Sequence, residues 1–122
     1  MYVLVWEFRP RRGREAEFEA AYGPEGEWVR LFRTVEGYLG TELHRDTADS
    51  RRYLTIDRWS SRSAYESFRA AHREAYEAID RRCVAFTEKE TPVGSFEAAG
   101  GDPDVGAPDG GGPDVGERPA GA

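Results

Sequence analysis

Along the first 97 residues, the pattern of hydrophobic and polar positions predicts four strands. The first stretch is rich in β-branched and aromatic side chains and stops before Pro10, which is typical of a strand. Two further stretches alternate between apolar and polar residues, and the polar turn between them predicts a hairpin. A fourth stretch contains Pro92 and Gly94, which favour an edge strand or a strand exchanged with a partner. The predicted strands are 2–9, 38–46, 52–59 and 88–97.

Between these strands, apolar residues recur three and four positions apart, which is the spacing of one face of a helix. The segment between the first two strands shows this spacing twice, over 15–22 and over 28–35. After the hairpin, Ser60 or Ser61 can cap a longer amphipathic helix of about six turns, with a bend near residues 69–73. The chain therefore has the order β-α-β-β-α-β.

This order predicts an α+β fold of the ferredoxin-like type, in which the helices cover one face of a four-stranded antiparallel sheet. To the covered face we assign Val3, Val5, Leu39, Leu43, Leu54 and Ile56. The opposite face then carries Leu4, Trp6, Phe8, Tyr53 and Trp59, mixed with Glu42, His44, Thr55 and Asp57. Because so much aromatic surface is unfavourable in water, we expect a second copy of the chain to cover it. Two facing sheets would form a dimeric α/β barrel around a cavity for a small apolar or aromatic molecule.

Composition separates this folded domain, residues 1–97, from the segment 98–122. That segment holds eight of the 14 glycines and four of the seven prolines, and it has no Phe, Trp, Tyr, Leu or Ile. It also has five acidic residues against one arginine, which accounts for most of the net charge of -6. Because it has little apolar surface to bury, it does not offset its ordering entropy. We predict a disordered, Gly/Pro/Asp-rich acidic tail.

Composition also excludes several classes of protein. No apolar run approaches the roughly 20 residues of a membrane-spanning helix, so we expect no membrane partner. An acidic chain lacks the positive charge with which proteins bind nucleic acids. A single cysteine, Cys83, cannot form an internal disulfide, which fits a cytoplasmic protein. One cysteine and two histidines do not supply a zinc site, so we expect no metal.

Four short motifs carry a family resemblance: Arg12-Gly13, residues 36–40 (EGYLG), residues 53–61 (YLTIDRWSS), and Ala64-Tyr65 with Phe68. With these motifs, residues 1–97 resemble the antibiotic biosynthesis monooxygenase (ABM) family of the dimeric α/β-barrel superfamily. The resemblance implies a homodimer and an oxygenase that uses molecular oxygen without a metal or flavin cofactor. In such enzymes the protein supplies an apolar cavity, a proton acceptor and stabilisation of charge.

The resemblance also implies roles for particular residues. Two positions implicated in the quinone-forming members match here, the strand-end Trp59 and the helix residue Tyr65. A third position, an Asn in those members, is Thr55 in this chain. A threonine hydroxyl lacks the carboxamide donor but can still donate one hydrogen bond.

Haem-degrading members of the same superfamily use an Asn on the first strand, a Trp on the second helix and a nearby His. The corresponding positions here are Trp6 and Phe68, with His72 four residues further along. Because the whole chain has no Asn, we do not expect it to bind or degrade haem.

Two side chains on the uncovered face are candidates for the proton acceptor. In the expected hairpin register, His44 lies opposite Tyr53, and it is either a general base or a hydrogen-bonded interface histidine. Asp57 is either a base in the cavity or half of an intersubunit ion pair with an arginine. We assign catalysis to His44, Trp59 and Tyr65, and substrate binding to Trp6, Glu42, Tyr53, Thr55 and Asp57.

Two functions compete on this basis. The first is a cofactor-independent monooxygenase that oxidises a small aromatic or polyketide-like compound in an apolar barrel cavity. The alternative is a non-catalytic dimeric module that binds such a molecule, and Thr55 at the position of the family Asn favours it.

Overall fold

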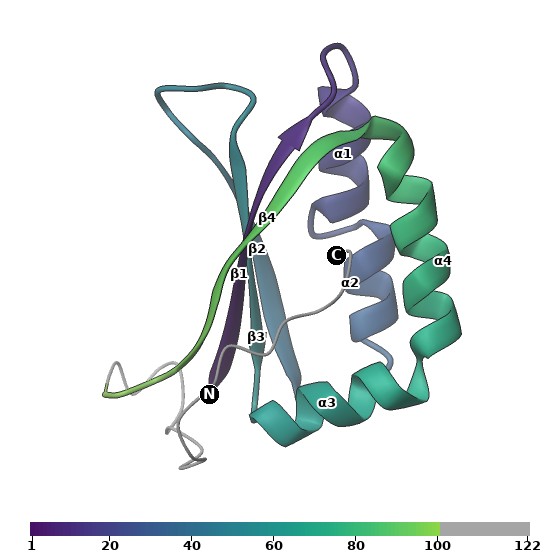
Figure 1. Ribbon diagram of the computed structural model, residues 1–122. Coiled ribbons are helices and arrows are strands. Elements are labelled where there is room, and N and C mark those ends of the chain that lie inside the picture. The colour runs from purple at the N-terminus through teal and green to yellow at the C-terminus, as the bar shows by residue number, and fades with distance from the viewer. Residues whose placement is uncertain (101–122) are drawn as a thin grey trace.

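The computed structural model describes residues 1–100 and has the predicted α+β, ferredoxin-like fold. Its four strands form one antiparallel sheet in the order β2-β3-β1-β4, and the helices pack on one side of it (Figure 1). The elements are β1 (Tyr2–Pro10), α1 (Glu15–Tyr22), α2 (Glu27–Phe32), β2 (Tyr38–Arg45), β3 (Tyr53–Trp59), α3 (Arg62–Ala71), α4 (Arg73–Cys83), a 3₁₀ turn η1 (Val84–Phe86) and β4 (Thr87–Glu97). Nearly all of the predicted tail, 98–122, lies outside the described residues.

The long helix predicted after the hairpin is divided into α3 and α4, which confirms the expected bend. Ser61 caps α3, because its hydroxyl accepts a hydrogen bond from the Ala64 N–H at 3.0 Å. The helix breaks at His72, whose φ of -121° and ψ of 31° are not helical. Figure 1 shows α3 crossing one end of the sheet and α4 running back beside α2. One amphipathic stripe therefore covers two different parts of the core.

The structure corrects the predicted assignment of the two sheet faces. The helices cover the aromatic set of alternating residues, which is almost fully buried: Tyr2, Leu4, Trp6, Phe8, Tyr53, Thr55 and Trp59. Of the set predicted to be covered, Leu43 packs against the core, whereas Leu39 is 54% exposed. Val3, Val5, Leu54 and Ile56 lie on the other face and are half-buried. The aromatic set is the covered one because it buries more apolar area and packs against the helix aromatics.

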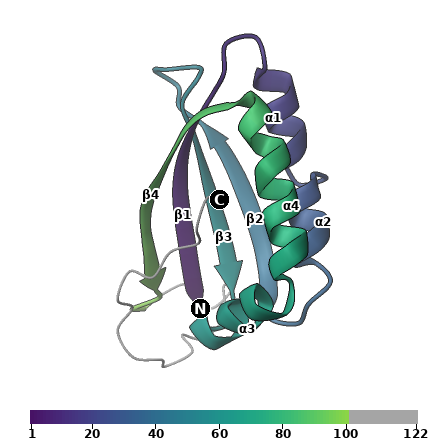
Figure 2. The same ribbon diagram turned by 45° about the vertical axis from the view of Figure 1, so that its right-hand side comes forward.

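The hairpin register also differs from the prediction by one residue. His44 pairs with Leu54, and Glu42 pairs with Ile56. Because side chains alternate along a strand, a shift of one residue moves each side chain to the opposite face relative to its neighbours. Glu42 and His44 therefore lie on the sheet face away from the helices. Figure 2 shows that the helices of residues 1–100 all lie on the other side.

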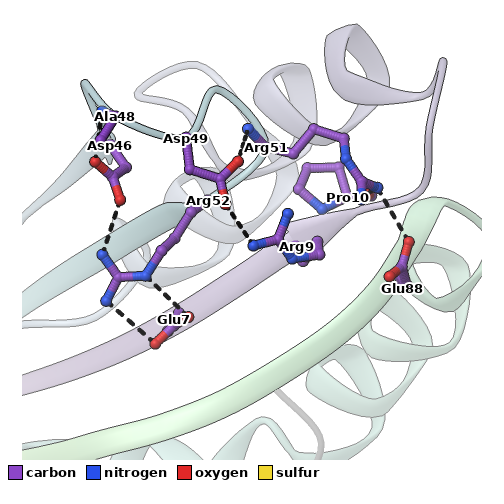
Figure 3. A network of polar contacts seen from close by, with 9 residues as sticks. All are labelled: Glu7, Arg9, Pro10, Asp46, Ala48, Asp49, Arg51, Arg52 and Glu88. Atoms are coloured by element: carbon purple, nitrogen blue, oxygen red, sulfur yellow. Dashed lines mark hydrogen bonds and ion pairs between the residues drawn. The ribbon is translucent and has the colours of Figure 1, made fainter.

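A network of ion pairs ties the β2–β3 hairpin to the rest of the sheet (Figure 3). Arg9 on β1 binds Asp49 in the hairpin loop at 2.6 Å, and Arg52 binds Glu7 at 3.0 Å. Arg51 reaches across to β4, where it binds Glu88 at 3.0 Å. The network holds the loop against β1 and β4, although partly exposed pairs of this kind each add little stability.

Candidate functional site

A cavity lies between the sheet and the helices, on the covered face. Its walls are mostly aromatic, and it holds about 30 Å³ of free space behind an open mouth. The residues that line it are Leu4, Trp6, Phe8, Tyr22, Trp28, Phe32, Thr41, Thr55, Asp57, Tyr65 and Tyr76. An apolar cleft with a few polar groups has the composition of a small-molecule site.

Asp57 carries the one charged side chain among the lining residues of the described chain. It lies on β3 between Leu4 of β1 and Thr41 of β2, and the Thr41 hydroxyl donates a hydrogen bond of 2.6 Å to its carboxylate. Burial raises the pKa of Asp57 to about 6, and the hydrogen bond from Thr41 opposes this rise. A carboxyl with this pKa is mostly ionised at neutral pH and can still accept a proton, as a general base must.

Tyr65 brings a phenol to the cavity from α3. The Arg69 guanidinium, one turn further along the helix, donates a hydrogen bond of 3.2 Å to the Tyr65 hydroxyl. Arg69 also lies over the ring of Tyr76, with its central carbon 3.9 Å from the ring centre. Burial raises the pKa of Tyr65 well above its usual range, so the phenol is neutral at physiological pH. Because a guanidinium can only donate, the Tyr65 oxygen accepts here and its own O–H is available to a ligand.

Other polar atoms around the cavity are buried without a hydrogen-bond partner. Two of them are the indole N–H of Trp6, on a residue that is 5% exposed, and the hydroxyl of Tyr76, on a residue that is 2% exposed. Buried polar groups in folded proteins nearly always have a partner, either from the protein or from water or a ligand. Trp6 and Tyr76 therefore place polar groups without a protein partner in the wall of the cavity.

The structure brings together only some of the residues that the sequence predicted for the site. Trp6, Thr55, Asp57 and Tyr65 all line the cavity. Trp59 is fully buried beside it, with its ring 5.4 Å from that of Tyr65, and does not line the cavity. Its contact with Tyr65 makes it a support for that side chain.

The other predicted residues lie elsewhere. Tyr53 is buried at the far end of the sheet, where its hydroxyl donates a hydrogen bond to Glu19. His44 and Glu42 are exposed on the opposite face, where the Nε2 atom of His44 lies 2.8 Å from the Oε1 atom of Glu42. The one-residue change in hairpin register separates His44 from the cavity, so of the two candidate proton acceptors only Asp57 lines it. Asp57 lies under the helices, and no arginine of residues 1–100 pairs with it.

Sequence reasoning also missed several residues of the cavity. Tyr76 lies on the apolar face of the long helix predicted after the hairpin, and Trp28 and Phe32 lie on that of the helix predicted over 28–35. The burial of these three side chains could be predicted from the sequence, but their meeting at one cavity could not. Thr41 stands on the edge strand β2 and had no signal beyond its alternation. Within residues 1–100, no group of three or more His, Cys, Asp or Glu side chains could hold a metal ion. No helix of the same residues is both long and apolar enough to cross a membrane.

Comparison with solved structures shows where this fold occurs. SnoaB from Streptomyces nogalater, described as a cofactor-independent oxygenase, matches with a TM-score of 0.64 and 22% identity, over 84% of this chain and 96% of that one. PA3566 from Pseudomonas aeruginosa matches with a TM-score of 0.55 and 21% identity, over 75% of this chain and 87% of that one. A NIPSNAP domain protein from Burkholderia xenovorans matches with a TM-score of 0.61 and 18% identity, over 81% and 95% of the two chains. At these identities the likeness concerns the fold.

Comparison of sequences gives the family. No curated protein sequence matches this chain closely enough to count as a relative. The family model for antibiotic biosynthesis monooxygenase, by contrast, matches residues 1–81, which span β1 to most of α4 and carry every residue that lines the cavity. This chain therefore belongs to the antibiotic biosynthesis monooxygenase family.

Proposed function

We propose that this protein is a cofactor-independent oxygenase that oxidises a small phenolic or enolisable aromatic compound in the cavity under its helices. The observation that carries the proposal is a single carboxylate, Asp57, in an otherwise aromatic cavity. Membership of the family and the structural likeness to SnoaB, itself described as a cofactor-independent oxygenase, support the same reaction. The aromatic walls favour a flat, apolar substrate, because such a molecule gains most from leaving water there.

In the proposed reaction, Asp57 removes the acidic proton of the substrate, which is on the O–H of a phenol or on the CH₂ group of a keto tautomer such as an anthrone. The resulting anion, a phenolate or enolate, reacts with molecular oxygen. Conversion of a CH₂ group to a carbonyl releases four electrons, which reduce O₂ to the new carbonyl oxygen and one water molecule. No external reductant is needed, because the substrate supplies all of these electrons.

The remaining polar groups of the cavity serve to orient the anion. Tyr65 donates its O–H to the oxygen on which negative charge develops, and it is held by Arg69 and by the ring of Trp59. The unpaired N–H of Trp6 and the hydroxyl of Thr55 are further donors to the substrate. In this proposal Trp59 acts through Tyr65 and does not touch the substrate.

The test is oxygen uptake by the purified full chain with anthrones and hydroxynaphthalenes, with products identified by mass spectrometry. We expect activity to rise as the pH passes about 6, because Asp57 must be ionised to accept a proton. Asp57→Asn should lower kcat by about 100-fold or more, since the amide cannot act as a base. Glu77→Gln, the same carboxylate-to-amide change on the exposed side of α4, should leave the rate unchanged.

Two results would overturn the proposal. Tight binding of these compounds without any product would assign the chain to the non-catalytic binding modules. Full activity in Asp57→Asn would show that the cavity carboxylate is not the base.

We further propose that the chain forms a homodimer through the face of the sheet away from the helices. That face carries the half-buried side chains of Val3, Val5, Leu54 and Ile56, and next to them Phe96, which is 49% exposed. Contiguous apolar surface of this kind is typical of an interface between subunits. Light scattering on the full chain should give about twice 13.7 kDa, and Ile56→Glu should reduce this toward the monomer value. A monomeric wild-type protein would contradict this proposal.

A further inference from the structure

Asp57 stands at the end of a chain of hydroxyl groups that leads out of the cavity along β2. The Tyr38 hydroxyl donates a hydrogen bond to the Thr41 hydroxyl at 2.6 Å. The Thr41 hydroxyl in turn donates to the Asp57 carboxylate, also at 2.6 Å. Thr41 and Asp57 are paired neighbours on β2 and β3, so the sheet itself sets their separation.

The direction of these hydrogen bonds follows from the number of protons available. Each hydroxyl has one proton to donate, so Thr41, which accepts from Tyr38, commits its own proton to Asp57. An ionised carboxylate can only accept, which makes it the natural end of the chain. Within residues 1–100, the hydrogen bond from Thr41 is the one that reaches Asp57, and it occupies one carboxylate oxygen. The second oxygen is left for a molecule in the cavity.

The surroundings of Asp57 make this hydrogen bond important. The side chains that face the same cavity are apolar or neutral: Leu4 and Trp6 from β1, Trp28 and Phe32 from α2, Tyr65 from α3 and Tyr76 from α4. The guanidinium of Arg69, which holds Tyr65 beside the cavity, is engaged with Tyr65 and Tyr76. No lining residue of the described chain offers a positive charge to the carboxylate. Thr41 is therefore the group that favours its ionised form.

We propose that Thr41 and Tyr38 are positioning residues, which keep Asp57 ionised and turn one of its oxygens toward the cavity. Thr41 acts directly on the carboxylate, and Tyr38 acts through Thr41 by orienting and polarising its hydroxyl. The consequence for catalysis rests on the proposed function, whereas the consequence for the ionisation of Asp57 does not.

The experiment is a carboxyl ¹³C NMR titration of the full chain without substrate, with the Asp57 signal assigned by its loss in Asp57→Asn. Thr41→Val removes the hydroxyl but keeps the shape, and should move the midpoint of the Asp57 titration upward by about one pH unit. Thr41→Ser keeps the hydroxyl and should restore the wild-type midpoint. Tyr38→Phe should move the midpoint in the same direction by less, because it removes only the second hydrogen bond. If Thr41→Val does not fold, Thr41→Ala carries the same expectation.

A parallel measurement of oxygen uptake against pH separates this inference from the proposed function. In active enzyme, the acidic limb of the pH–rate profile should move with the NMR midpoint in each variant. A shifted midpoint in protein that consumes no oxygen supports the inference, and the proposed function alone then fails. A midpoint that is the same in wild type, Thr41→Val and Tyr38→Phe overturns the inference, even if the enzyme is active.

Discussion

Replacing the buried carboxylate of Asp57 by an amide should make the protein more stable at neutral pH while it removes activity. Asp57→Asn keeps the size of the side chain, and its amide oxygen can still accept the hydrogen bond from Thr41. The substitution removes the charge and replaces one of the two acceptor oxygens by an NH₂ group. Because that charge lies in an aromatic cavity without a positive partner, the folded state is destabilised by holding it.

The size of the effect follows from the pKa of Asp57, which is 3.8 for an ordinary aspartate and about 6 in this cavity. Since the folded pKa is raised, the folded state binds the proton more tightly than the unfolded state does. The wild type should therefore lose stability as the pH rises from about 4 to about 6, with the full loss present above that range. At 1.36 kcal/mol for each pH unit, the ionised carboxylate costs about 3 kcal/mol of unfolding free energy.

Urea denaturation of wild type and Asp57→Asn at a series of pH values measures this difference directly. The two proteins should have nearly equal unfolding free energies at pH 4, and the variant should be about 3 kcal/mol more stable above pH 7. Glu77→Gln should follow the wild type throughout, because Glu77 is exposed on α4. If Asp57→Asn is no more stable than the wild type at pH 8, the carboxylate is better compensated than the structure indicates, and the argument for a raised pKa is wrong.

Three further predictions concern other parts of the molecule. Arg69→Met should lower kcat about tenfold with little change in KM, because Tyr65 loses the hydrogen bond that orients it. Steady-state oxygen uptake measures both constants, and Arg69→Lys should retain part of the rate. Burial and the nearby Asp80 raise the pKa of Glu90 to about 8, so Glu90→Gln should raise the melting temperature above that of the wild type at pH 9 but not at pH 4. If variant and wild type melt at the same temperature at pH 9, this prediction is wrong. Gly37 has a φ of +94°, which is unfavourable for a residue with a Cβ atom, so Gly37→Ala should reduce the unfolding free energy by roughly 1–2 kcal/mol. Urea denaturation measures this, and an unchanged unfolding midpoint would show that the loop relaxes freely.

Much of the fold could be predicted from local pattern. The spacing of Phe18 and Tyr22 and that of Tyr65 and Phe68 both indicate helices, because 3.6 residues complete a turn and such residues share one face. Pro92 cannot donate a hydrogen bond to a neighbouring strand, so it marks β4 as an edge. The predicted strand–helix order and the bend near His72 depend on neighbours in sequence, and both were correct.

The chemistry of the site depended on which face of the sheet the helices cover, and sequence alone did not decide this. An alternating strand has two faces, and both sets here are apolar enough to be buried: Val3 and Val5 on one side, Trp6 and Phe8 on the other. The choice belongs to the tertiary structure, because it depends on how the helix aromatics pack and on a hairpin register that one residue can invert. That choice moved Asp57 into a cavity and left His44 outside it. The sequence by itself therefore determined the elements and the family resemblance, whereas only long-range packing decided which carboxylate became the candidate base.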